Sequence, residues 1–335
     1  FPSILYYFGL FMQIDSYAAR NNLKGLPDNE IPKIGKVIKE GWYFIFVFTM
    51  LIVMLLYMQR EAQAPYYATG TLLIINQIVK IHRWDFKRLL EFIQGVGSLF
   101  AELAGILAAI GLIIGSLTFT GKVGTITYEL VNFAGDNVLI LLVMGALTSF
   151  VLGIGMTVTA AYLFLAVTLA PALTSSGLDK VAVHLFMLYW GMISFITPPV
   201  AIGAFAAASI AGANGIKTGL QAMKLGSVIY FIPFFFVLNP ALIGRGELTD
   251  IIIVFISAVI GIVLIASSLQ GYLIGLGNLN KLKHMEWPLR AMLGLSGILM
   301  ALPGGEIVGY SNFEINITAL ILALPAILLL ILKNK

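Results

Sequence analysis

Charged residues are scarce in this sequence, and cysteine is absent. Asp, Glu, Lys and Arg together make up 11% of the 335 residues, and there are only three histidines. Soluble domains carry about 25% charged residues, so this chain has too little charge to cover a surface that faces water. The composition therefore excludes a soluble enzyme, a disordered protein and a nucleic-acid-binding protein. Without cysteine, a disulfide framework and a thiolate metal site are excluded as well.

Long apolar segments dominate the chain instead. Hydrophobic residues make up 59% of it, and its first residues, Phe1 to Ser3, already stand in an apolar stretch. We therefore expect a fragment that begins partway through a longer membrane protein. A membrane-spanning helix needs about 20 mostly apolar residues. We predict an all-α polytopic membrane protein with apolar segments near 1–18, 42–58, 66–80, 98–118, 138–173, 182–212, 218–243, 249–276, 289–302 and 316–332.

The basic residues indicate an orientation in the bilayer. Sixteen of the 20 Lys and Arg residues lie in five short stretches, namely 20–39, 80–88, 217–224, 281–290 and 333–335. Loops that are rich in Lys and Arg stay in the cytoplasm, so we place these five stretches there. The other four basic residues then lie on the outer side. In this topology the apolar segment 138–173 must leave and re-enter at the same outer face.

Two glycines interrupt the segment 138–173 in its middle. No Asp, Glu, Lys, Arg or His occurs from Asn137 to Leu178, and Gly153 and Gly155 divide this run into two legs. A leg of about 15 residues is about 22 Å long as a helix, which is short for a bilayer core of about 30 Å. We therefore favour a re-entrant hairpin whose tip is buried in protein or lines a watery cavity. Two full spans joined by a tight turn are the alternative.

A second interruption lies at Pro198-Pro199, inside another run without charge or histidine. Adjacent prolines remove two N–H donors and push Thr197 away from helical backbone angles, so the helix must break there. The predicted halves are about 182–196 and 200–212. A simple proline kink is the alternative. Two interrupted elements in one chain are, however, the usual indication of a binding site in a secondary transporter.

An amphipathic stretch precedes the segment 98–118. Phe86, Leu89, Leu90 and Ile93 recur at helical spacing, and the charged residues lie largely on the other faces. This pattern predicts a helix at 83–94 that lies in the cytoplasmic interface. The alternative is that these residues are only the polar start of the next span.

Several motifs resemble the large permease subunit of TRAP transporters, and most closely the fused permeases of the TAXI branch. The resemblance is dense from about residue 1 to 245, whereas 249–335 looks like a C-terminal extension. The residues that carry it are Gly41-Trp42, Gly115 to Gly121, Val151 to Tyr162, Ala170 to Leu173, His184 to Phe186, Ile196 to Val200, Ala211 to Asn214 and Phe236 to Leu242.

The resemblance implies the second half of an inverted-repeat, elevator-type transporter of the inner (cytoplasmic) membrane. It would take up a small organic acid with sodium as coupling ion. Its implied partners are a periplasmic TAXI-type solute-binding protein and a small membrane subunit, either fused or separate. The implied parts are scaffold helices with an interfacial arm at 1–97, a transport domain at 98–213 (helix 98–118, hairpin 138–173, broken helix 182–212), a following transmembrane helix at 214–245 and the extension at 249–335.

The resemblance also places the candidate sodium and substrate site at the two interruptions. Sodium prefers oxygen ligands, which backbone carbonyls and Thr or Ser hydroxyls supply. No carboxylate occurs in either segment. The candidates at the hairpin tip are Gly153, Gly155, Met156, Thr157 and Thr159, and those at the broken helix are Ser194, Thr197 and Pro198.

Other classes of membrane protein remain as alternatives. An intramembrane enzyme would need a buried nucleophile–base pair or metal ligands, and neither pattern is present, so we expect no enzyme. An ion channel or a structural membrane subunit is the remaining alternative to a transporter. A channel would conduct without a sodium gradient or a binding protein.

Overall fold

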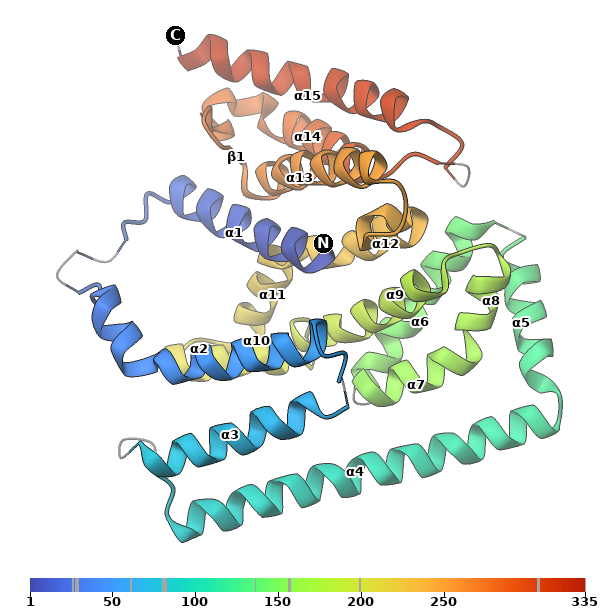
Figure 1. Cartoon of the computed structure of the whole chain (residues 1–335). Helices are drawn as coiled ribbons and strands as arrows, with labels where there is room; N and C mark the ends of the chain where they lie inside the picture. The colour runs from blue at the N-terminus through green and yellow to red at the C-terminus, as the bar shows by residue number, and fades with distance from the viewer. Residues whose placement is uncertain are drawn as a thin grey trace. The chain divides into compact units, whose positions relative to one another are not determined.

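The computed structural model consists almost entirely of helices (Figure 1). Its one sheet is a pair of two-residue strands, β1 (Tyr272–Leu273) and β2 (Gly277–Asn278), in the part of the chain that the structure describes. The described residues are 1–25, 27, 30–60, 62–79, 83–135, 137–155, 158–198, 200–305 and 308–334. They form two compact units, one comprising residues 24–106 and the other comprising residues 1–23 and 107–335.

The smaller unit contains two helices that pack side by side, α2 (Ile34–Leu56) and α3 (Ala64–Ile78) (Figure 1). Helix α2 begins eight residues before the predicted apolar segment at 42–58. The added residues include Lys36, Lys39 and Glu40, which are exposed. The apolar pattern therefore located the membrane part of this helix, whereas the helix itself continues into a polar first turn.

Helix α4 (Phe86–Phe119) is continuous over 34 residues, about 51 Å at the usual rise per residue. The predicted interfacial stretch 83–94 and the predicted segment 98–118 are thus not separate helices, and the predicted boundary at 97 lies within one helix. The connecting residues 94–98 include Gly95 and Gly97 but no proline. A glycine costs a helix only about 1 kcal/mol, whereas proline costs about 3 kcal/mol. The alternative interpretation, a polar start of the following span, agrees with this continuity.

The predicted hairpin is built from several helices. Helix α6 (Val138–Gly155) includes both Gly153 and Gly155, and α7 (Val158–Thr168) includes Thr159. The two glycines therefore do not interrupt the helix as predicted, because a glycine costs a helix only about 1 kcal/mol. Met156 and Thr157, between the two helices, lie outside the described residues. A short helix, α8 (Ala170–Ser175), follows because Pro171 stands at its start and cannot continue the preceding helix. Helix α5 (Lys122–Phe133) precedes the hairpin and was not among the predicted apolar segments, because it carries Lys122 and Glu129.

The predicted break before the two prolines is present. Helix α9 (Lys180–Met192) continues into a short 3-10 turn, η1 (Ile193–Phe195), and α10 (Ile202–Ala211) begins beyond the prolines. Both α6 and α7 pack against α9, so the hairpin lies beside the broken helix. Figure 1 shows these three helices together.

The predicted transmembrane helix at 214–245 is not a single helix. The chain forms α11 (Gly215–Leu225), η2 (Ser227–Tyr230), α12 (Ile232–Leu238) and η3 (Pro240–Ile243). The two halves differ in direction by 66°. The bend follows Leu225, where Gly226 ends α11. Pro233 stands in the first turn of α12 and Pro240 follows that helix, and both lack the N–H group that an unbroken helix would need there. The apolar composition of this segment is that of an ordinary span, so the sequence analysis did not predict this third interruption.

The first helix packs on the C-terminal helices in the larger unit. Helix α1 (Pro2–Arg20) contacts α13 (Leu248–Gln270), which packs against α14 (Glu286–Ala301). The 3-10 turn η4 (Leu279–Met285) precedes α14, and α15 (Asn312–Asn334) completes the chain. An added Cβ at Gly261 of α13 would lie 2.6 Å from the Gly297 carbonyl oxygen of α14. Small residues thus allow these two backbones to approach closely, as is common between membrane helices.

Three helices within the described residues are long and apolar enough to cross a membrane, namely α2, α13 and α15, and the bent pair at 215–238 would be a fourth if it forms one span.

The main core joins α1, the hairpin, α9 and α12. Among its fully buried side chains are Leu142, Leu173, Phe186 and Phe236. This core holds the hairpin and the broken helix against each other and so positions the candidate site.

Candidate functional site

The hairpin and the broken helix meet at a contact between two glycines. Gly153 lies in the last turn of α6 and is buried. A Cβ added to it would lie 2.6 Å from the carbonyl oxygen of Gly191, in the last turn of α9. Real Cβ atoms do not approach an oxygen so closely, so only glycine allows this packing. The sequence-predicted residue Gly153 is therefore within contact of the break.

The other predicted tip residues are only partly described. Gly155 ends α6, and Met156 and Thr157 lie outside the described residues. Thr159 stands in the first turn of α7, and its side chain is exposed. The described geometry thus brings Gly153 to the broken helix and does not place the Thr159 side chain in the same contact.

Two hydroxyl groups are buried at the break itself. Ser194 is 1% exposed, and its Oγ donates a hydrogen bond to the Gly191 carbonyl at 3.0 Å. Thr197 is 4% exposed, and its Oγ1 donates to the Ile193 carbonyl at 2.8 Å. Each hydroxyl oxygen keeps acceptor capacity after donating its proton. Ser194 therefore contacts the Gly191 carbonyl that faces the hairpin, and Thr197 lies three residues further along the break.

The backbone beyond the prolines is held in an unusual conformation. Ala201 is fully buried and has a φ of +36°, a region that residues with a side chain rarely adopt. Its N–H donates to the carbonyls of Ser194 at 3.0 Å and Thr197 at 3.1 Å. A conformation of this kind typically costs about 1–3 kcal/mol and persists where the surroundings enforce it, often at functional sites.

Tyr230 is a site residue that the sequence analysis missed. Its hydroxyl lies 2.8 Å from Thr197 Oγ1, and it comes from η2 in the third interrupted element. Thr197 already donates to Ile193, so the Tyr230 hydroxyl donates to Thr197. Pro233, three residues further along an apolar run, was the available signal that the chain turns here.

The third interrupted element also packs closely on Ile196 and Pro198. A Cβ added at Gly219 would lie 2.7 Å from Pro198 Cγ, and one added at Gly226 would lie 2.9 Å from Ile196 Cδ1. Pro198 is half-buried in this contact. Glycines in α11 and at its end therefore make room for the break, and Pro198 has a packing role.

Trp190 provides a buried donor one turn before Ser194. Its ring lies edge-on to the rings of Tyr230 and Phe234, with centroid distances of 6.0 and 5.8 Å. Its Nε1 is buried and has no hydrogen-bond partner among the described residues. A buried N–H group normally finds a partner, so this indole is available to an acceptor that enters the site.

Two polar contacts support α9 away from the break. The Tyr162 hydroxyl of α7 and His184 Nδ1 of α9 are 3.1 Å apart, which joins the second part of the hairpin to the broken helix. Asp179 caps the start of α9 by accepting the Ala182 N–H at 2.9 Å, and it pairs with Arg245 at 2.7 Å. These contacts fix the end of α9 that is distant from Ser194.

Asp179 has a perturbed ionisation that makes a pH prediction possible. Partial burial by itself would raise the pKa of Asp179, but the backbone N–H groups that it accepts and the Arg245 guanidinium together lower the pKa. A folded-state pKa below the unfolded value of about 3.9 stabilises the protein above that pH. This stabilisation is lost as the pH falls through the folded-state pKa.

We expect Asp179→Asn to reduce stability at neutral pH by up to about 1 kcal/mol, because asparagine keeps a capping oxygen but loses the exposed ion pair. Thermal unfolding of both proteins in detergent, from about pH 7 down to about pH 3, should give curves that converge below about pH 4. A difference that stays constant throughout this range would show that the carboxylate charge does not contribute.

The described residues contain no group of three or more His, Cys, Asp and Glu side chains that could hold a metal ion. The arrangement at the break instead consists of hydroxyl groups, backbone carbonyls and one indole N–H. It can therefore coordinate a hard cation through oxygen and donate a hydrogen bond to an anion. It contains no nucleophile paired with a base.

Comparison with known proteins identifies the family. The family described as "Tripartite ATP-independent periplasmic transporter, DctM component" matches residues 1–251, which include the hairpin, the break and Tyr230. No curated protein and no solved structure matches the chain. The family is a transporter permease, so the chain is a multi-pass membrane protein and not an enzyme, and the family implies a periplasmic binding protein and a small membrane subunit as partners. The prediction of a TRAP large permease is confirmed, and the chain belongs to the DctM component family of tripartite ATP-independent periplasmic transporters.

Proposed function

We propose that this permease takes up a small organic acid together with sodium ions across the inner membrane, and that a TAXI-type periplasmic binding protein delivers the acid. The observation that carries the proposal is the contact between Gly153 and Gly191, which brings the hairpin to within reach of the buried hydroxyls of Ser194 and Thr197. In this proposal the ion and the substrate bind where the two interrupted elements meet.

The chemistry of the break suits a sodium ion. Sodium is a hard cation that prefers oxygen ligands, and the hydroxyls at Ser194 and Thr197 retain acceptor capacity after their own donations. The carbonyls near a helix end carry the negative end of the helix dipole, which also favours a cation. Gly155, Met156 and Thr157 at the tip are further proposed ligands.

Charge balance supports coupling between the ion and an organic acid. No Asp, Glu, Lys, Arg or His occurs from Leu185 to Ile216, so the break has no side chain to neutralise a bound cation. A charge buried without a counter-charge is costly, and a substrate carboxylate would remove most of that cost. The indole N–H of Trp190 would then donate to this carboxylate. Ion and substrate should therefore bind more strongly together than separately.

We further propose an elevator mechanism for the larger assembly. The hairpin, α9 and α10 would move together as a transport domain. The expected boundary at 97 is not kept in this proposal because it lies within the continuous helix α4, and α1 is not part of the fixed scaffold because Leu5 belongs to the same core as the hairpin. The shared core between the hairpin and α9 supports their movement as one body. The strained backbone at Ala201 would preserve the shape of the break during this movement.

The sodium proposal predicts a specific effect of Thr197→Val. Valine has a similar volume but no hydroxyl, so it removes one oxygen from the proposed ion site. We expect sodium affinity to fall by about tenfold or more, the typical effect of losing a hydrogen-bonding group that contacts a charge. The measurement is the rise in melting temperature with sodium chloride, with choline chloride at equal ionic strength as the reference.

Two variants separate ion binding from local structure. Thr197→Ser keeps the hydroxyl and should retain the sodium response, whereas Tyr230→Phe removes only the neighbouring hydroxyl that donates to Thr197. If Thr197→Val loses stability equally in both salts and still responds to sodium, the hydroxyl is structural and the proposed ligand is wrong.

A proteoliposome assay distinguishes the proposal from an ion channel or a structural subunit. Uptake of labelled carboxylic acids should require an inward sodium gradient, the binding protein and the small subunit. Ion conductance that requires neither a sodium gradient nor the binding protein would favour a channel.

A further inference from the structure

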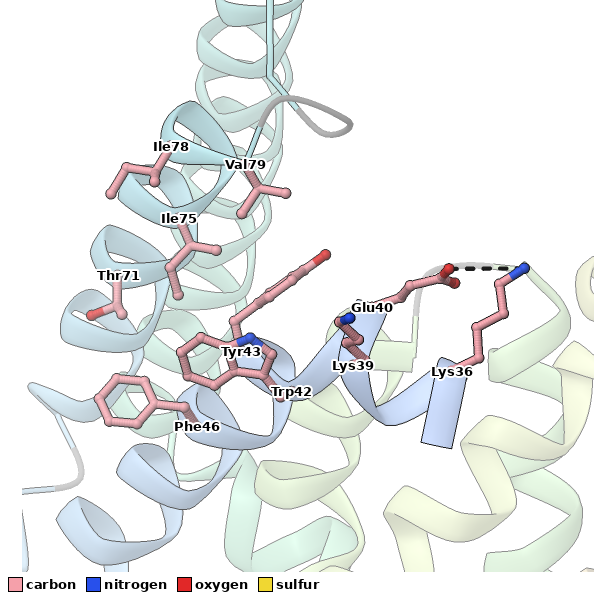
Figure 2. Close-up of a pocket in the computed structure, with 10 residues that line it drawn as sticks. All are labelled: Lys36, Lys39, Glu40, Trp42, Tyr43, Phe46, Thr71, Ile75, Ile78 and Val79. Atoms are coloured by element: carbon pink, nitrogen blue, oxygen red, sulfur yellow. Dashed lines mark ion pairs between the residues drawn. The ribbon is translucent and has the colours of Figure 1, made fainter. Parts of the chain in front are cut away.

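A cavity lies between α2 and α3 in the unit formed by residues 24–106, outside the proposed transport site (Figure 2). Its volume is about 1060 Å³. It is lined by residues from the first part of α2 and from the second part of α3. Lys36 and Glu40 at the start of α2 are exposed, and we call this charged end of the cavity its opening. The start of α2 lies within the basic stretch 20–39, so the positive-inside rule places the opening at the cytoplasmic surface of the bilayer.

The cavity wall changes from charged to apolar along α2. Lys36, Lys39 and Glu40 stand near its opening, and Phe46 stands two turns deeper, about 10 Å beyond Lys39. Ile75 and Ile78 of α3 also line the cavity, with Ile78 at the end of α3 (Figure 2). Thr71 lines it one turn beyond Ile75, and its hydroxyl donates to Met50 Sδ at 3.8 Å. A charged opening followed by an apolar wall matches a molecule with a polar head and a hydrocarbon chain.

The balance of charge at the opening is positive. Lys36 and Glu40 form an ion pair with a distance of 4.0 Å, and their side chains are 74% and 63% exposed. Exposed pairs of this kind are weak, so Lys36 can be shared with another anion. Lys39 adds a second positive charge on the side of the cavity. An acidic headgroup would therefore meet two ammonium groups and one carboxylate.

Aromatic side chains stand between the charged and apolar parts. Trp42 and Tyr43 line the cavity one turn beyond Lys39, and Trp42 is 59% exposed. Trp and Tyr are enriched at the level of lipid headgroups, where one end of the ring is apolar and the other is polar. Their position agrees with the boundary between a headgroup and its acyl chains.

We propose that this cavity binds an anionic phospholipid of the cytoplasmic leaflet. The phosphate lies at Lys39 and Lys36, and an acyl chain follows the apolar wall formed by Phe46, Ile75 and Ile78. Basic pockets between membrane helices on the cytoplasmic side bind anionic headgroups in this way. A free phosphate would meet the same ammonium groups but would leave the apolar wall uncovered. This proposal is independent of the transport function.

Quenching of Trp42 by brominated lipid tests the proposal. The full chain is reconstituted in vesicles of phosphatidylcholine that contain a fixed small fraction of chain-brominated phosphatidylglycerol or chain-brominated phosphatidylcholine. The contribution of Trp42 is the difference between the natural protein and Trp42→Phe. We expect stronger quenching of Trp42 by the brominated phosphatidylglycerol, and no reversal by added inorganic phosphate.

Charge variants identify the residue that selects the headgroup. Lys39→Gln should reduce the preference for phosphatidylglycerol about fivefold, the typical contribution of one lysine near an anionic lipid surface. Glu40→Gln should preserve or strengthen it because the carboxylate opposes the phosphate. Lys33→Gln is the matched control, since this lysine immediately precedes α2 and does not line the cavity.

Three results would overturn the proposal. Equal quenching of Trp42 by both brominated lipids would mean that only ordinary surrounding lipid reaches the cavity. Reversal of quenching by inorganic phosphate would indicate a site for the soluble anion. Absence of quenching by either lipid would mean that another helix, from a partner or a second copy, covers the cavity.

Discussion

Gly153→Ala is expected to reduce uptake by about tenfold or more and to destabilise the contact between the hairpin and the broken helix. The new Cβ would lie 2.6 Å from the backbone oxygen of Gly191, so one of the two helices must move. A backbone carbonyl cannot rotate away from the new methyl group as the end of a flexible side chain can. Overpacking of this kind costs about 1–3 kcal/mol. Such a cost changes the population of the packed state by about five- to 150-fold. Proteoliposome uptake and thermal unfolding measure the two effects.

The partner glycine offers a matched control for this prediction. Among the residues that the structure describes, a Cβ added to Gly191 would meet only Val158 Cγ1, at 3.7 Å, which is ordinary van der Waals contact. Gly191→Ala should therefore leave uptake and stability close to those of the natural protein. Gly145→Ala, on the same helix as Gly153, would meet a movable Leu169 methyl group at 3.1 Å and should have a small effect. Equal losses in all three variants would contradict the proposed close contact.

Arg290→Met is expected to have the second large effect, a loss of about 3 kcal/mol in stability. Arg290 is 8% exposed and donates to the carbonyls of Ser268 and Leu269, each at 2.7 Å. These carbonyls belong to the last turn of α13, where a cation also meets the negative end of the helix dipole. Arg290 Nη1 further pairs with Glu286 at 3.1 Å. Methionine would leave two carbonyls without their charged donor and would weaken the pairing of a largely buried carboxylate.

Arg20, Glu286 and Arg290 form a charged cluster that joins the C-terminal extension to the part of the chain that matches the family. Arg20 of α1 donates to the Gln270 carbonyl at 2.7 Å and reaches the same Glu286 oxygen at 3.5 Å. Arg290 and Glu286 lie beyond residue 251, where the family match ends. The loss caused by Arg290→Met should therefore appear in the unfolding of the whole larger unit rather than as early release of α14 and α15.

Two variants test the assignment of this loss to Arg290 contacts. Arg290→Lys keeps the charge but has no planar fork to reach two carbonyls and Glu286 together, so its loss should be intermediate. Lys217→Met removes a positive charge from an exposed position on α11 and should change stability by less than about 0.5 kcal/mol. If Lys217→Met and Arg290→Met were equally destabilising, a general effect of charge would explain both.

The elements that sequence reasoning predicted well are those with a strong local cause. Proline fixes its own φ and lacks an N–H group, so the break at Pro198 could be predicted without knowledge of its neighbours. The continuity of α4 through its polar start was harder to predict, because glycines at 95 and 97 reduce helix stability without ending the helix. The bend after α11 was missed because Gly226 ends that helix within a run whose apolar composition resembles an ordinary span, and a single glycine does not by itself predict a helix end.

The sequence by itself determined that this chain is a helical membrane protein whose helix from Lys180 ends before Pro198, because composition and proline chemistry act locally along the chain. Only the tertiary structure decided that Gly153 packs on Gly191 and that Tyr230 donates to Thr197. Those contacts depend on the distances between separate helices, which the packing of the whole core sets. A linear pattern of apolar residues contains no information about which backbone oxygen a distant glycine will face.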